Sequence, residues 1–152
     1  MKGGPSVFIK NGPNKLPRMS RRIDTVKVGE VMRSVGNVFD ENKVHRFAEL
    51  SGDLNPIHFS NTGGKPIVHG MLCAGLIPAL FSKNFPGCVY ASQNLNFKKP
   101  VFLDMPVYAE IRVAKIRLMK SHYFLKCETY VRFENDSMEC INGMASVLVP
   151  IE

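Results

Sequence analysis

Residues 70–85 read GMLCAGLIPALFSKNF, and this stretch decides the fold. It is apolar on nearly every side and contains no carboxylate. A helix that is hydrophobic all round must be buried by the rest of the protein. Because Pro78 cannot donate a backbone hydrogen bond, we expect a kink or a break inside this helix.

Four stretches that follow the helix have the composition of β-strands. They are rich in β-branched and aromatic residues and are separated by short turn-forming segments such as residues 134–137. The strands are expected at residues 88–97, 106–118, 122–134 and 138–149. One buried helix followed by such a meander predicts an α+β domain, with an antiparallel sheet wrapped around the helix.

The chain before the buried helix is more varied. Residues 26–39 read as extended, with glycines as breaks. Asp40 is placed to cap a short amphipathic helix that ends near Gly52. Residues 52–67 (GDLNPIHFSNTGGKPI) have the composition of a loop.

Composition limits the class of protein. A chain of 152 residues with 45% hydrophobic and 22% charged residues suits one globular domain. No uninterrupted apolar run reaches the roughly eighteen residues that a membrane-spanning helix needs. The sequence therefore predicts no membrane span.

The net charge of +7 is concentrated at the N-terminus. Residues 1–23 hold six basic residues and no acidic one, whereas residues 24–152 carry a net charge of only +1. A nearly neutral domain argues against nucleic-acid binding. We expect residues 1–23 to be a basic extension or an organelle-targeting segment, and residues 24–152 to form the domain.

The cysteines are widely spaced and form no C-x-x-C pair, so they predict no metal site. They lie in apolar surroundings, as buried reduced thiols do. They are Cys73, Cys88, Cys127 and Cys140.

Polar residues gather in the loop that precedes the buried helix. Asp53, Asn55 and His58 surround Pro56, which fixes its own backbone and holds Asn55 extended. A carboxylate and a neutral imidazole near one carbon atom are suited to paired proton transfers. The alternative interpretation is an Asx-turn, in which Asp53 and Asn55 only bind loop N–H groups.

Gly70 opens the buried helix, where backbone N–H groups have no helical partner. A glycine there lets a substrate oxygen approach the backbone closely and can stabilise an enolate, although close packing is the alternative interpretation. We expect the preceding residue, His69, to have a structural, capping or supporting role.

Four motifs together resemble the MaoC-like (R)-specific hydratase family. They are SGDLNPIH (51–58), IVHGML (67–72), FPGCVYASQNLNF (85–97) and FKKPVF (97–102), in the order found in that family. The resemblance covers about residues 26–150 and is greatest to small single-domain members, including mitochondrial 3-hydroxyacyl-thioester dehydratases.

The resemblance implies a hot-dog fold, an antiparallel sheet around a long central helix, that usually dimerises. It also implies the reversible hydration of trans-2-enoyl thioesters to (R)-3-hydroxyacyl thioesters, on coenzyme A or acyl carrier protein, without a metal or redox cofactor. Asp53 and His58 match the catalytic pair, Asn55 the supporting amide and Gly70 the oxyanion-hole N–H. A mitochondrial location is expected from the same relatives and the basic N-terminus, with the cytoplasm or another organelle as alternatives.

The chain departs from the family in two places. The segment between His58 and His69 is shorter than in most relatives by more than one helical turn, and residues 60–65 (SNTGGK) replace a small helix. This segment lines the acyl pocket in relatives, so the pocket is expected to differ in shape. Leu103-Asp104 stands where Gly-Asp is usual.

Two other functions remain open for a hot-dog protein of this kind. A thioesterase commonly carries its carboxylate on the central helix, and residues 70–85 have none. A non-catalytic acyl-thioester binding module would keep the fold without the chemistry. The pair Lys98-Lys99 is interpreted as a solvated strand end, or as a contact for a carrier phosphate.

Overall fold

The computed structural model describes residues 22–59 and 63–151, so most of the expected N-terminal extension lies outside the described residues. The strands are β1 (Val31–Arg33), β2 (Val89–Gln93), β3 (Asn96–Phe97), β4 (Val107–Leu118), β5 (His122–Phe133) and β6 (Glu139–Pro150). The helices are α1 (Glu41–Ser51), α2 (Gly70–Ala74) and α3 (Leu76–Asn84), with 3-10 turns η1 (Ile23–Thr25) and η2 (Pro56–His58).

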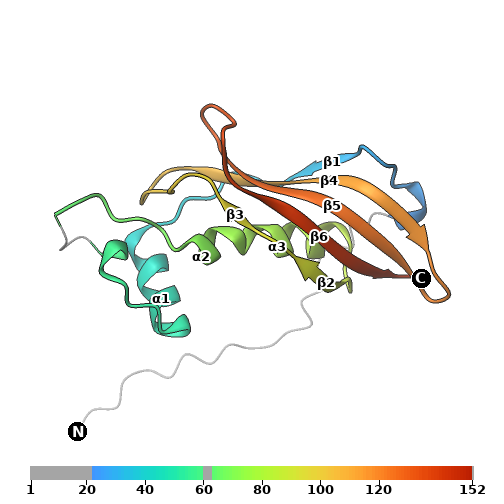
Figure 1. Ribbon diagram of the computed structural model, residues 1–152, viewed down its shortest axis with the longest axis horizontal. Coiled ribbons are helices and arrows are strands. Elements are labelled where there is room, and N and C mark those ends of the chain that lie inside the picture. The colour runs from blue at the N-terminus through green and yellow to red at the C-terminus, as the bar shows by residue number, and fades with distance from the viewer. Residues whose placement is uncertain (1–21, 60–62, 152) are drawn as a thin grey trace, which may run out of the picture.

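The strands form one antiparallel sheet in the order β1-β4-β5-β6-β2, and β3 pairs with β6. The sheet covers α2 and α3, whereas α1 lies to one side of them (Figure 1). This arrangement confirms the predicted α+β hot-dog fold. It brings the loop between α1 and α2 to one end of the central helices.

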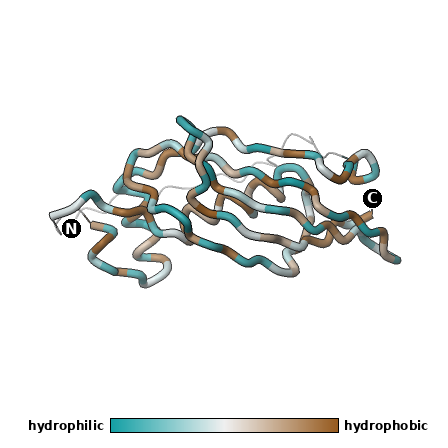
Figure 2. Tube along the Cα trace, turned by 45° about the horizontal axis from the view of Figure 1, so that its top comes forward, coloured by the Kyte–Doolittle hydropathy of each residue, from teal (hydrophilic) through white to brown (hydrophobic). Residues whose placement is uncertain are grey.

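The long strands agree with the sequence prediction to within about a residue because each has one buried face. Hydrophobic and hydrophilic residues alternate along them (Figure 2), as expected for a sheet that packs on a core with one face. From α3, Ile77, Leu80 and Phe81 are buried against this sheet. Phe81 is fully enclosed and meets the Tyr90 ring edge-on, with a centroid distance of 5.5 Å.

The predicted strand over residues 88–97 is divided into β2 and β3. Asn94 lies between them and exchanges two hydrogen bonds with Met144: its backbone N–H donates to the Met144 carbonyl, and its side-chain oxygen accepts from the Met144 N–H. Gly143, next to Met144, packs directly against the Asn94 backbone. This contact between distant segments interrupts the strand. In residues 26–39, only β1 is regular strand.

The central helix is also divided. We predicted one helix over residues 70–85 that would kink or break at Pro78; instead α2 ends at Ala74 and α3 begins at Leu76. Pro78 has no N–H for the Ala74 carbonyl, and its ring would clash with that carbonyl in a continuous helix. The chain therefore breaks one turn before the proline, and Pro78 itself occupies the first turn of α3, where a proline is tolerated.

The helix before the polar loop begins and ends as predicted. The side chain of Asp40 accepts a hydrogen bond from the Lys43 N–H at 2.9 Å, which is a regular N-cap. Gly52 ends α1 in the left-handed region, with φ of 77°. Among the described residues, no helix has the length and apolar character needed to cross a lipid bilayer.

Candidate active site

Asp53 and His58 lie face to face at the end of the central helices. A carboxylate oxygen of Asp53, Oδ2, lies 3.7 Å from Nε2 of His58. Only 7% of the His58 side chain is exposed, whereas half of Asp53 is exposed. The imidazole is therefore sheltered and the carboxylate faces solvent, so a small polar molecule can reach the space between them.

The His58 ring is oriented by the chain that leads into α2. Its Nδ1 lies 2.6 Å from the Ile67 carbonyl oxygen. Since a carbonyl only accepts, Nδ1 carries the proton and donates it. In the neutral ring, Nε2 then presents a lone pair towards Asp53. The separation of 3.7 Å is too long for a direct hydrogen bond, and a water can bond to both atoms at about 2.8 Å.

The structure contains the hydrogen bonds of the Asx-turn interpretation, and it also places Asp53 beside His58. The Asn55 N–H donates to Asp53 Oδ1, and the Ile57 N–H donates to Asn55 Oδ1, as the turn interpretation predicts. The second carboxylate oxygen of Asp53 remains directed at His58. The turn therefore holds Asp53 in place and leaves one of its oxygens for chemistry.

Gly70 lies beside this pair at the first position of α2. An added Cβ would lie 2.6 Å from Cε1 of Phe97, so this ring packs directly on the glycine. Phe97 comes from β3 and is 54% exposed. Close packing against an aromatic ring, the alternative interpretation of Gly70, is thus present; as the first residue of α2, Gly70 has an N–H without a partner inside the helix.

Two hollows meet at Gly70 and Phe97. One, of about 310 Å³, includes His58 and is otherwise mainly apolar. Its apolar lining is Ile57, Ile67, Val68, Cys73, Val101 and Ile141. The other, of about 350 Å³, includes Asp53, His69 and Met71. The catalytic candidates are therefore divided between two adjoining spaces, with Phe97 and Gly70 in both.

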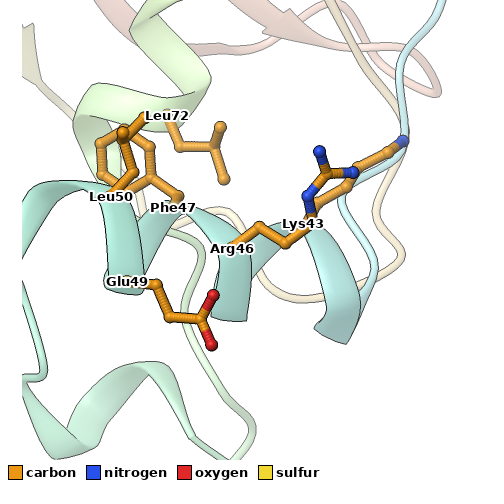
Figure 3. A pocket seen from close by; sticks show the side chains of 6 residues that line it. All are labelled: Lys43, Arg46, Phe47, Glu49, Leu50 and Leu72. Carbon is orange, nitrogen blue, oxygen red and sulfur yellow. The ribbon is translucent and has the colours of Figure 1, made fainter. Parts of the chain in front are cut away.

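A third, wider hollow lies along α1 and lacks the candidate pair. Phe47 and Leu50 of α1 meet Leu72 of α2 there, and Lys43 and Arg46 extend along the same helix (Figure 3). The Leu50 side chain is 86% exposed. This hollow combines an apolar surface with two cations and one carboxylate, that of Glu49, and contains neither Asp53 nor His58.

The segment shortened relative to the family still brings the two motifs together. The Ile67 N–H donates to the Ile57 carbonyl at 3.0 Å, so the chain returns directly beside η2. Residues 60–62 lie outside the described residues. At the other departure, Asp104 occupies the left-handed region with φ of 63°, a conformation that aspartate tolerates better than most residues.

His69 was expected to be structural, and its contacts are more specific than that expectation. It occupies the N-cap position of α2 without making a side-chain cap. Instead its Nε2 lies 3.1 Å from the Asp53 carbonyl, and its ring stacks on His58 with a centroid distance of 3.6 Å. No pattern in the sequence predicts a bond to a distant backbone carbonyl. The VHG motif placed His69 near the site but did not give its contacts.

Asp53, His58 and His69 also form a candidate metal-ligand set, with one ligand atom of each within 4.8 Å of the others. Two imidazoles and a carboxylate are suitable donors for zinc. The two rings are stacked, however, with only 23° between their planes. Their lone pairs lie in nearly parallel planes, so one ion could bind both nitrogens only if a ring left the stack.

The cysteine beside the apolar hollow is not an activated nucleophile. Burial raises the pKa of Cys73 to about 12, so its thiol stays protonated at neutral pH. At the other side of this hollow, the backbone N–H groups of Lys98 and Lys99 donate to the Cys140 carbonyl. Both lysine side chains are exposed at the edge of the hollow, as either interpretation of this pair requires.

Comparison with known proteins gives sequence relatives of one kind. The chain is 32% identical over 131 residues to a mitochondrial 3-hydroxyacyl-[acyl-carrier-protein] dehydratase of Arabidopsis thaliana, covering 82% of this chain and 78% of the relative. It is 40% identical over 101 residues to an (R)-specific enoyl-CoA hydratase of Aeromonas caviae, covering 61% and 75%. Both relatives are named for adding water to, or removing it from, an acyl thioester.

The fold agrees with a solved structure of the same kind. An (R)-hydratase from A. caviae involved in PHA biosynthesis superposes with a TM-score of 0.73 at 32% identity, covering 83% of this chain and 98% of that one. The family model described as "MaoC like domain" matches residues 18–129, most of the chain. The chain therefore belongs to the MaoC-like domain family, and it is a hydro-lyase by the class of its named relatives.

Proposed function

We propose that the chain catalyses the reversible hydration of trans-2-enoyl thioesters to (R)-3-hydroxyacyl thioesters, with Asp53 and His58 as the catalytic pair. The observation that carries the proposal is the gap of 3.7 Å between Asp53 Oδ2 and His58 Nε2. A water held by both acceptors has its oxygen directed outward, where the β-carbon of an enoyl group can meet it. Two bases aimed at one water are suited to proton transfer in both directions.

In the hydration direction, the water oxygen bonds to the β-carbon as the pair removes a proton from it. The electrons of the double bond move towards the thioester carbonyl and form an enolate. The α-carbon then takes a proton from the pair, so that one water is added overall and the pair returns to its starting state. One member of the pair handles the β-carbon hydroxyl and the other the α-carbon proton; because both start as acceptors, the proton taken from water passes from the first member to the second before it reaches the α-carbon.

The enolate oxygen is the costly charge in this reaction. We infer that the Gly70 N–H binds it, because this group is unpaired in the helix and borders both hollows. One such donor typically lowers the barrier by about 3 kcal/mol. Asn55, whose side-chain oxygen is used in the turn, is proposed to support the water or hydroxyl through its amide group.

The substrate proposed for the apolar hollow beside His58 is the acyl chain of a coenzyme A or acyl-carrier-protein thioester. Apolar walls accept hydrocarbon, and Lys98 and Lys99 at the edge suit a phosphate of the carrier. The named relatives act on both carriers, so the carrier is a matter for assay. A set of enoyl thioesters of increasing length on both carriers measures the preference directly.

Product chirality and the catalytic pair test the proposed function. Wild-type protein should consume crotonyl-CoA and release only the (R)-3-hydroxy product. Asp53→Asn and His58→Ala should each lower turnover by about 10²–10⁴-fold, because each removes one proton acceptor. The double variant should be scarcely slower than the slower single one, since the two act as a unit.

Matched variants separate chemistry from folding in this test. Asp136 also accepts a backbone N–H two residues on, from Met138, and His122 lies at the start of β5. Asp136→Asn and His122→Ala should therefore keep the wild-type rate. If Asp53→Asn and His58→Ala keep it too, the pair is not catalytic and other groups carry the reaction. A wild-type protein that binds the thioester without hydrating it would instead support the acyl-thioester binding module.

We further infer that residues 1–23 direct the chain to mitochondria and that the domain works as a homodimer. The inferred location is supported by the mitochondrial relative and by six basic residues without an acidic one. Bacterial enzymes are relatives as well, so a fluorescent protein fused behind residues 1–23 is the direct test. Diffuse cytoplasmic fluorescence would contradict the inferred location.

A further inference from the structure

We propose that His69 is a positioning residue for the catalytic pair. It orients the His58 ring and anchors the backbone of Asp53 without touching the reacting atoms. This inference rests on the function proposed above for Asp53 and His58. His69 is 2% exposed, immediately precedes Gly70 and contacts both members of the proposed pair.

The first contact joins His69 to the Asp53 segment. Its Nε2 lies 3.1 Å from the Asp53 carbonyl oxygen. A carbonyl only accepts, so Nε2 carries a proton and donates it. This bond spans sixteen residues of chain and ties the loop after α1 to the start of α2. The bond therefore fixes the Asp53 segment, and with it the carboxylate, relative to α2, the helix that begins with Gly70.

The second contact fixes the plane of the His58 ring. The two imidazoles are stacked, with centroids 3.6 Å apart and 23° between their planes. The bond from His58 Nδ1 to the Ile67 carbonyl sets the direction of the ring within its plane, and the stack sets the plane itself. Together they leave His58 Nε2 one direction, which is towards Asp53.

The packing around His69 keeps its own ring in place. Phe47 of α1 meets it with a centroid distance of 4.9 Å and a tilt of 59°. The ring thus has contacts from α1, from η2 and from the loop that follows α1. Because three segments hold the His69 side chain, it can keep the neighbouring His58 ring in one orientation through each turnover.

An unpaired atom shows why a histidine occupies this position. Nδ1 of His69 is buried and has no hydrogen-bond partner among the described residues. Burying an acceptor without a partner costs stability. A leucine or phenylalanine would avoid this cost and fill the same space. What the histidine offers, and an apolar side chain lacks, is the N–H directed at the Asp53 carbonyl.

Three variants of His69 separate the effect of its hydrogen bond to Asp53 from the effect of its stack on His58. His69→Phe keeps an aromatic ring for the stack and loses the donor. His69→Gln keeps a donor near the position of Nε2 and loses the ring. His69→Leu loses both. We expect His69→Leu to lower kcat for crotonyl-CoA by about 10-fold to 100-fold, with KM changed much less, and each of the other two variants to recover part of the loss.

A spectroscopic measurement tests the same inference without relying on activity. In ¹⁵N-labelled protein, the His58 ring should give the signals of one tautomer with its proton on Nδ1. His69→Leu should mix this tautomer with the other, and His69→Phe should keep it. His122→Leu, a change at the far end of β5, should alter neither kcat nor the His58 signals.

The outcomes separate this inference from the proposed function. If wild-type protein lacks hydratase activity, or tolerates the loss of Asp53 and His58, the proposed function fails. If those tests succeed and His69→Leu keeps its kcat and its His58 signals, only the positioning role is overturned. Equal losses of kcat in all three variants, in step with falling Tm, would also overturn it, because they would indicate general packing.

Discussion

At the scale of single residues, the site combines groups from two motifs that are separated in sequence. The loop of residues 53–58 holds the proposed acid-base pair, and Gly70 lies beside it as the proposed N–H donor. The two motifs lie side by side because Ile67 makes two hydrogen bonds: its N–H donates to the Ile57 carbonyl, and its carbonyl accepts from His58 Nδ1. Each of these bonds uses a backbone group, so the site depends on loop conformation as much as on the identity of its side chains.

Gly70→Ala tests the role of the backbone at this point. The added methyl group would meet the Phe97 ring at 2.6 Å, and because this ring is largely exposed it can move aside. We expect a loss of stability of roughly 1 kcal/mol. The methyl and the displaced ring would block the approach of a thioester oxygen, so kcat/KM should fall by at least about tenfold.

A second substitution distinguishes a clash of the added methyl group with Phe97 from a clash with the substrate. Gly70→Ala combined with Phe97→Leu should regain the lost Tm, because the smaller side chain yields to the methyl group. It should not regain the activity. Full recovery of both would mean that Gly70 serves only the packing of Phe97.

The residues of the site were predictable from sequence to different degrees. Asp53, His58 and Gly70 lie close together, as their motifs led us to expect, whereas Asn55 lines neither of the two hollows and uses its side-chain oxygen in the turn; the roles of all four remain predictions. The contacts of His69 were not predictable, because a carbonyl acceptor such as that of Asp53 is present at every residue. The packing of Phe97 on Gly70 required knowledge of how β3 lies over α2.

At the scale of helices and strands, the regular alternation of buried and exposed side chains decided which elements could be predicted from the sequence. The three long strands β4, β5 and β6 were placed nearly correctly because one face of each is buried. The division of β2 from β3 was missed, since it depends on the contact between Asn94 and Gly143. The break in the central helix was predicted near Pro78 and lies one turn earlier, where the missing hydrogen bond falls.

Gly143→Ala tests the close packing of β6 on the Asn94 backbone. An added Cβ would lie 1.9 Å from the Asn94 carbonyl oxygen, which is backbone and cannot swing away. We expect a loss of at least about 2 kcal/mol in the free energy of unfolding. Gly64→Ala is the matched control, since nothing lies within 4 Å of its added Cβ. Chemical denaturation of both variants measures the difference, and equal stabilities would disprove the close contact.

At the scale of the whole molecule, the exposed edge of the sheet bears on assembly. β2 is an outer strand, and its Val89 side chain is 61% exposed. An open edge with apolar side chains favours pairing with another chain. We expect light scattering at micromolar concentration to give twice the mass of 17.0 kDa. A measurement that gives only the mass of the monomer would contradict the homodimer.

Two substitutions of equally exposed side chains locate the interface. Val89→Glu places a charge on the β2 edge and should dissociate the dimer. Leu118 is 62% exposed at the end of β4, away from that edge, and Leu118→Glu should leave the mass unchanged. The opposite result would move the interface to the β4 side of the sheet, across from β2.

The buried thiols predict how stability changes in alkali. Burial raises the pKa of Cys73 and of Cys127 from 9.0 to about 12. Between pH 9 and about 12 the unfolded chain loses these protons while the folded chain retains them. Stability should therefore fall as the pH rises through this window, by up to about 1.4 kcal/mol per pH unit for each thiol.

The measurement is the free energy of unfolding in urea at several pH values above and below 9. The Cys73→Ala/Cys127→Ala variant provides the comparison, since tyrosines and lysines titrate in the same range. Its stability should fall less steeply above pH 9 than that of the wild type. Parallel slopes for the two proteins would show that these thiols are already ionised or exposed in the folded state.

The one-residue break at Gly75 divides the central helix into two segments that share one core. The segment before it carries Gly70 and also buries Cys73 and Ala74, and the segment after it buries Ile77 and Phe81. Gly75 keeps a right-handed helical backbone, and its N–H donates to the Met71 carbonyl, so the two segments stay joined by a helical hydrogen bond. We therefore expect a core substitution that moves α3 to displace Gly70 as well, which would couple thermal tolerance to substrate choice among variants of this protein.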